Sequence, residues 1–325
     1  MRVSRRMLVS ALVIHAGARG WAEAIAQVGG TEPARLLISL GDGATHAVAR
    51  QLAEGARVRM NRPVVVEERL GASGRIAAVI LKNAPADGST VALLPIVVPV
   101  LAPLVFKDVN YDPIRDFVPV CQVATYAYGL AVPANHPART MPEFIQWAKA
   151  NPGKSFFGTG AAGSLPHFLG LVIVKETGVE MTHVGYKGGN AMALELAGGT
   201  IPAGIGGLSD FIEFHKAGRI RVLATSDSKR IEQLPDVPTF SEQGLPGIVA
   251  RGWTGVFAPA RTPAPIVDQW NAALVGAVRA PELRDLLISF GLAPTGTSQR
   301  EFGDILAADI ARWGPIVKAS GFRGD

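Results

Sequence analysis

The residues best suited to binding a ligand form a loop almost without side chains, from Gly158 to Gly163. An apolar run, Ser155–Phe157, precedes it and predicts the end of a strand. Ser164 follows as a candidate N-cap, and apolar residues then recur at helical spacing. Because the loop leads into a helix, free backbone N–H groups and the positive end of the helix dipole favour an anion there. The sequence therefore predicts an anion-binding loop.

Three of these glycines also match the spacing of a dinucleotide fingerprint, G-x-G-x-x-G, at Gly158, Gly160 and Gly163. Glu180 follows at about the distance expected for a ribose-binding acid. Such fingerprints usually belong to the first strand-to-helix turn of a nucleotide domain, whereas this loop lies in mid-chain. We therefore favour an anion cradle. The alternatives are an exported dinucleotide-dependent enzyme that uses the Gly158–Gly163 loop, and glycines that only permit a tight turn.

Sequence patterns for catalysis are missing from the chain. It has no G-x-S-x-G segment, and its six histidines show neither H-x-x-x-H nor HExxH spacing. Cys121 is the single cysteine, which excludes an intramolecular disulfide and a cysteine zinc cluster and suits core packing. His167 and His183 flank one predicted helix, but no pattern supplies a nucleophile for them. We therefore predict a binding protein rather than an enzyme, with no cofactor and no metal.

The first 26 residues have the pattern of a cleavable export signal. Arg5-Arg6 forms a basic start, an apolar stretch follows, and Ala24–Ala26 is an A-x-A cleavage site before Gln27. The paired arginines fit a twin-arginine signal, and ordinary Sec export fits equally well. We expect a periplasmic protein that begins at Gln27.

Length and composition describe an exported globular protein of two domains. The chain has 325 residues, of which 48% are hydrophobic and 18% charged, enough for an ample core. Residues 1–26 hold four of the 32 basic side chains and one of the 27 acidic ones, so the rest is close to neutral. Since no basic tract is suited to nucleic acid, that class of partner is excluded.

A pattern of strand, small-residue loop and helix recurs in both halves of the chain and predicts an α/β fold. Strands are expected at Arg35–Leu40, Pro63–Glu67, Val91–Leu94, Phe117–Val123, Met181–Tyr186, Ile201–Ile205, Ile220–Ala224 and Trp253–Ala258. Gly129–Pro133 begins a second region, and Trp253–Ala258 leads back to the first. We therefore expect one lobe from residues 31–131 plus 251–325 and another from 132–250. Ligands of such sheets bind beyond the carboxyl ends of the strands.

Seven stretches carry a resemblance to a known family. They are Val66–Gly74, Asn110–Phe117, Ser164–His167, Gly185–Gly188, Lys216–Ile220, Leu234–Thr239 and Phe257–Ala260. Together, and in this order, they resemble the solute receptors of the tripartite tricarboxylate transporter family, the Bug-type periplasmic binding proteins. The resemblance implies a two-lobed Venus-flytrap fold with a doubly wound sheet in each lobe and two crossover strands as a hinge. It also implies a monomer that binds a small carboxylate or similar metabolite and delivers it to membrane permease subunits.

In this family the ligand carboxylate is held mostly by backbone N–H groups and small hydroxyls of two loops, one in each lobe. The resemblance implies a ligand site made of Gly43, Ala44, Thr45, His46, Gly160, Ala161, Ala162, Gly163, Ser164, His167 and Tyr186. Thr45 and Ser164 are also expected to cap their helices. His167 either contacts the ligand or packs behind the loop, and Tyr186 borders the cleft.

Four departures from the family pattern leave the ligand open. The first loop is approached through Ile38–Gly41 rather than Pro-Phe/Tyr-Pro, and His46 stands where Asp is usual. Asp42 replaces a common Gly and puts a negative charge in the supposed anion cradle. Either the ligand is amino-acid-like, with an amino group for Asp42, or Asp42 points to solvent. In the second lobe, Ile205–Gly207 lacks an Asp that the family often has there.

Overall fold

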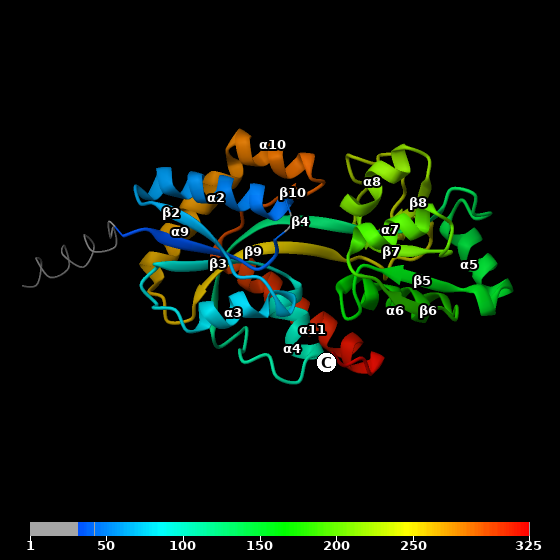
Figure 1. Cartoon of the computed structure of the whole chain (residues 1–325), viewed down its shortest axis with the longest axis horizontal. Helices are drawn as coiled ribbons and strands as arrows, with labels where there is room; N and C mark the ends of the chain where they lie inside the picture. The colour runs from blue at the N-terminus through cyan, green and yellow to red at the C-terminus, as the bar shows by residue number, and fades with distance from the viewer. Residues whose placement is uncertain (1–31, 42, 325) are drawn as a thin grey trace, which may run out of the picture.

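The computed structural model describes residues 32–41 and 43–324. The predicted export signal and Asp42 therefore lie outside the described residues. Two lobes follow each other along the long axis of the molecule, and two long strands run from one into the other (Figure 1).

The first lobe is a mainly parallel sheet with helices on both faces. Its strands run in the order β2-β1-β3-β9-β4, with β1, β2 and β3 parallel and β9 antiparallel to both β3 and β4. They are β1 (Ala34–Ile38), β2 (Val64–Glu68), β3 (Thr90–Pro95), β4 (Phe117–Pro133) and β9 (Arg251–Pro259), with the short β10 (Ala293–Pro294) beside β4.

Two groups of helices cover this sheet. The first group is α2 (Gly43–Met60), α9 (Ala264–Arg279) and α10 (Pro281–Ser289); the second is α3 (Arg75–Lys82), α4 (Ala102–Val105) and α11 (Gln299–Ser320). The groups lie on opposite faces (Figure 1). Two short turns that the sequence did not predict, η1 (Ala72–Gly74) and η2 (Val97–Leu101), follow β2 and β3 at the carboxyl edge of the sheet.

The second lobe repeats the arrangement on a smaller scale. The carboxyl half of β4 continues into it and pairs with β7 and β8, and β5 lies between β7 and β6. The strands are β5 (Phe156–Thr159), β6 (Thr182–Gly185), β7 (Gly204–Gly207) and β8 (Ile220–Thr225). The helices are α5 (Met141–Ala150), α6 (Leu165–Thr177), α7 (Gly189–Ala197) and α8 (Leu208–Lys216), with the short turns η3 (Pro152–Lys154) and η4 (Ser241–Gln243).

Strand β4 is longer than the sequence analysis predicted. Phe117–Val123 and Gly129–Pro133 were expected as separate pieces, but 17 residues form one strand, which spans about 55 Å. Between the lobes it pairs with β9, where Tyr126 lies opposite Gly252. A side chain at Gly252 would collide with the rings of Tyr126 and Tyr128, so only a bare backbone fits there. The crossover is thus a closely packed pair of strands.

Strand β7 begins at Gly204 rather than at Ile201. Ile201 is buried against Gly158 before the strand starts, so its apolar side chain reflects core packing and not strand pairing. The other predicted strands lie within two residues of their expected ends. None of the helices among residues 32–41 and 43–324 is both long and apolar enough to cross a membrane.

A contact outside the two crossover strands also joins the lobes. Phe322 follows α11 of the first lobe, and its ring packs edge-on against His167 and Phe168 of α6, at centroid distances of 5.1 and 6.1 Å. The largest apolar cluster accordingly runs through both lobes. Phe322 therefore connects the segment after α11 with the helix that begins at the predicted anion-binding loop.

Candidate ligand-binding site

The loop between β5 and α6 follows the predicted layout, with one correction. The helix begins at Leu165, and Pro166 in its first turn suits a position where no amide hydrogen is needed. Ser164 is the N-cap residue, but its hydroxyl donates to the carbonyl of Ala161 at 2.7 Å instead of accepting from the helix. Among the described residues, therefore, no side chain caps the first turn of α6. Its amides, apart from Pro166 which has none, therefore lack a side-chain acceptor in that part of the chain.

Two histidines support this loop. The backbone N–H of Gly163 donates to Nδ1 of His167 at 3.1 Å, so this amide is already occupied. The His167 ring is 5% exposed and stacks on His183 at 3.8 Å between centroids. Of the two expected roles for His167, this geometry fits packing behind the loop.

Thr159 connects the second histidine to the same loop. Its hydroxyl donates to the carbonyl of Ala161 at 3.0 Å and lies 2.7 Å from Nε2 of His183. Since the hydroxyl hydrogen is used, Nε2 of His183 is the donor in this contact. Burial, with a contribution from His167, lowers the pKa of His183 to about 4, and burial also lowers the pKa of His167. Both rings are therefore neutral near pH 7.

The glycines of the loop are required for close packing. Gly188 donates to the carbonyl of Gly160 at 2.7 Å, and a Cβ on Gly160 would lie 2.7 Å from the nitrogen of Gly189. Gly163 has φ +72° and faces the Phe322 ring. Gly158 belongs to β5 and faces Tyr186. Each glycine of the fingerprint spacing is thus explained by a different packing contact. Gly160 in particular has no space for a side chain.

Tyr186 is half-buried over Gly158, with Ile201 and Met192 beside it. Its backbone N–H donates to the carbonyl of Thr159 at 2.8 Å. Burial raises the pKa of its phenol. The ring therefore belongs to the core that α7 and α8 form, and its neighbours there are apolar.

On the first lobe the predicted residues open α2. The helix starts at Gly43, so Thr45 lies inside its first turn and is not an N-cap, which corrects the prediction. Nε2 of His46 lies 2.7 Å from Oε1 of Glu68 at the end of β2. A Cβ on Gly43 would meet nothing within 4 Å. The carboxyl ends of β1 and β5, which lead into these loops, both point towards the boundary between the lobes (Figure 1).

Asp210 is a buried acid that the sequence patterns above did not single out. It lies in the first turn of α8, accepts a hydrogen bond from the Gly207 amide, and packs directly on Gly189 at the start of α7. Burial raises its pKa to about 6, against the effect of that hydrogen bond. An acid three residues after the N-cap is a known capping pattern that could have identified it. Asp210 supplies a carboxylate next to Ile205–Gly207, where the family Asp was missing.

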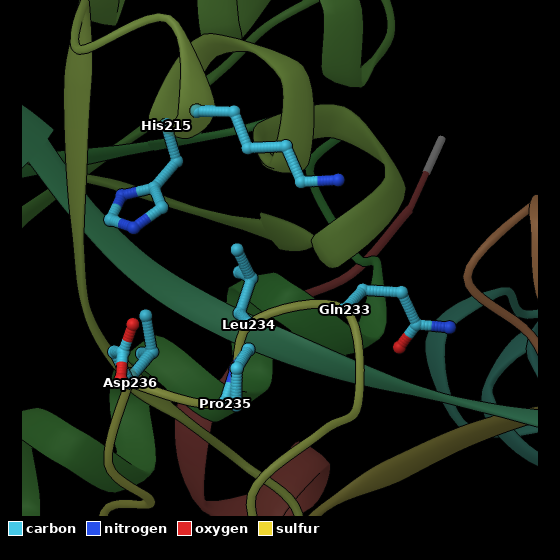
Figure 2. A pocket seen from close by; sticks show the side chains of 7 residues that line it. His215, Gln233, Leu234, Pro235 and Asp236 are labelled. Carbon is cyan, nitrogen blue, oxygen red and sulfur yellow. The ribbon is translucent and has the colours of Figure 1, made fainter.

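Two cavities formed by described residues lie away from these loops. One of about 330 Å³ is lined by the end of α8 and residues 233–237; Figure 2 shows His215 and Asp236 on one side of it and Gln233 on the other. Nδ1 of His215 accepts from the Val222 amide at 3.1 Å, which fixes the ring on β8. The second, of about 320 Å³, lies between α3 and residues 108–110. Neither is lined by a predicted ligand-binding residue.

Known proteins resemble this chain over most of its length. The sequence model of the tripartite tricarboxylate transporter family receptor matches residues 48–322. A protein encoded in the tcbD-tcbE intergenic region of Pseudomonas sp. strain P51 is 32% identical over 276 residues, which cover 85% of this chain and 82% of the relative.

Two solved structures from Rhodopseudomonas palustris share the fold. Rpa4515 with adipate is 31% identical, with a TM-score of 0.78 over 90% of this chain and 98% of the other. MatC with bound malate is 25% identical, with a TM-score of 0.74 over 88% and 98%. These comparisons confirm the predicted two-lobed binding-protein fold and a receptor rather than an enzyme. The chain belongs to the receptors of the tripartite tricarboxylate transporter family.

Proposed function

We propose that this protein is an extracytoplasmic receptor that binds a small carboxylate between its lobes and delivers it to a tripartite tricarboxylate-type permease. The observation that carries the proposal is the uncapped first turn of α6, which follows a loop held in place by Thr159, His167 and Gly188. Backbone amides at a helix N-terminus bind a carboxylate without a cationic side chain. The adipate and malate in the related structures support this ligand class.

The first lobe would complete the site through Gly43–His46 at the start of α2. The lobes would comprise residues 31–131 plus 251–325 and residues 132–250, with β4 and β9 as the hinge. Closure about two such strands would bring the two helix N-termini to one ligand. We further propose that the receptor is periplasmic and monomeric; mass spectrometry of the periplasmic fraction should find Gln27 as its first residue, and an uncleaved cytoplasmic chain would contradict export.

Calorimetry on the mature protein with adipate and malate tests the ligand class. The informative variant is Gly43→Val, because the new side chain enters open space and removes no contact. It should abolish binding and leave the melting temperature nearly unchanged. Gly153→Val is the matched control, since it also enters open space but lies in η3. If the parent binds neither acid, or if folded Gly43→Val binds like the parent, the proposed site is wrong.

A further inference from the structure

Ser39 carries a hydroxyl that has no partner in the part of the chain that the structure describes. It follows β1 directly and stands before the loop that leads to α2. Its side chain is buried, with 2% exposure, and its Oγ makes no hydrogen bond with any described residue. An unsatisfied buried hydroxyl destabilises a folded protein, so its presence calls for another role.

The Ser39 side chain lies against the N-terminus of α3. A Cβ on Gly74, the N-cap residue of that helix, would lie 3.2 Å from Oγ of Ser39. No described side chain caps α3. The amides of Gly74 and Arg75 donate to the carbonyls of Gly71 and Ala72, which leaves the amides after Arg75 in the first turn for a ligand. Arg75 begins the helix and adds positive charge beside the turn; its Nε donates to the carbonyl of Ala72 at 2.8 Å, and its guanidinium lies over the Phe106 ring. A helix N-terminus, a cation and a hydroxyl donor together suit an anionic oxygen.

The backbone above Ser39 is strained. Gly71, Ala72, Ser73 and Gly74 all have positive φ, at 111°, 48°, 55° and 88°. For Ala72 and Ser73 this left-handed conformation is unfavourable, and such strain is concentrated at functional sites. Gly74 covers the hydroxyl with backbone alone. Access of a ligand oxygen to this buried hydroxyl requires the turn to move.

We propose that Ser39 is a ligand-binding residue whose hydroxyl donates to the second carboxylate of a dicarboxylate, next to the N-terminus of α3. This rests on the proposed function, in which the first carboxylate lies at α6. Leu40 and Leu70 border the position, at 37% and 45% exposure, and Leu70 lies over Gly41. They would contact the carbon chain between the two carboxylates. A ligand so held bridges the lobes and stabilises their closure.

A structural role and a ligand-binding role for Ser39 predict opposite changes in stability. If the hydroxyl supported the fold, Ser39→Ala would lower the melting temperature. If it is kept for the ligand, removing an unsatisfied donor should leave the melting temperature of the ligand-free protein unchanged or higher. Thr262→Val is the matched control, because Oγ1 of Thr262 is likewise buried without a described partner but follows β9 and lies outside the proposed site.

Calorimetry with adipate and hexanoate, which share a six-carbon chain and differ by one carboxylate, tests the assignment. We expect the parent to prefer adipate, Ser39→Ala to lose roughly 10- to 100-fold in adipate affinity with little change for hexanoate, and Thr262→Val to bind like the parent. Unchanged adipate affinity in Ser39→Ala, equal losses for both acids, or a lower melting temperature would overturn the role of Ser39 alone. A parent that binds neither adipate nor malate would overturn the proposed function as well.

Discussion

The loop after β5 is supported on several sides, whereas Gly43 at the start of α2 borders open space. In the second lobe, Gly160 contacts Gly188, Gly163 is bonded to His167, and Phe322 lies against both the loop and the ring. In the first lobe, a Cβ on Gly43 would meet no atom within 4 Å, and the Ser39 hydroxyl forms no hydrogen bond with a described residue. We therefore propose that the ligand docks first on the second lobe and that the first lobe then adapts to it.

The largest expected effect comes from adding one methyl group to a glycine in each loop and comparing the two losses of stability. Gly160→Ala places Cβ against the backbone of Gly188 and Gly189, which cannot yield as a side chain would, so we expect a loss of about 3 kcal/mol in the free energy of unfolding. Gly43→Ala enters open space and should change it by less than about 0.5 kcal/mol. Urea titration measures both. Similar values for the two variants would mean that the loops do not differ in support.

A second effect concerns pH. The pKa of His183 falls from its ordinary 6.5 to about 4 in the folded protein. Between these values the unfolded chain binds more protons, so the stability present above pH 6.5 is lost as the pH falls to 4. Burial also lowers the pKa of His167, so this histidine likewise reduces the stability as the pH falls. Acidification should thus weaken the supported loop.

Protonation of Asp210 changes the stability in the opposite direction over part of this pH range. Its pKa is raised from 3.8 to about 6, so it adds stability as the pH falls between those values. We therefore compare the parent with His183→Gln, which keeps an amide to contact Thr159 but does not titrate. Melting temperatures from pH 7.5 to 4 should fall more steeply for the parent. Parallel curves would show that His183 does not titrate with the fold.

The smallest effect is expected at the contact between the C-terminus and α6. Phe322→Ala removes a half-buried ring from His167 and Phe168, which should cost about 1–2 kcal/mol. Phe322→Leu keeps an apolar side chain there and should lose less. Because the ring also lies against Gly163, ligand affinity should fall with stability in Phe322→Ala. Loss of stability without loss of affinity would show that the Phe322 contact does not influence ligand binding.

The order of strands and helices follows from local patterns, and so does the position of the candidate loops. Gly158–Ser164 and Gly43–His46 both precede periodic apolar residues, which indicates a helix start without knowledge of the fold. The contacts of the loops depend on residues far along the chain. Gly160 meets Gly188, Gly163 meets Phe322, and Ser39 faces Gly74, and no local spacing encodes these pairs. Thr45 was misassigned because α2 starts at Gly43, three residues earlier than a capping threonine at position 45 would require.

The most direct test of the account is a nuclear magnetic resonance titration of the mature protein with adipate or malate. We predict that the backbone amides of Ala161, Ala162 and Ser164 shift on binding, followed by those of Gly43–Thr45, since both helix N-termini share the ligand. The amide of Gly163, already bonded to His167, should move least of its loop. Shifts confined to the cavity lined by His215 and Asp236, with none in the two loops at saturation, would contradict the account.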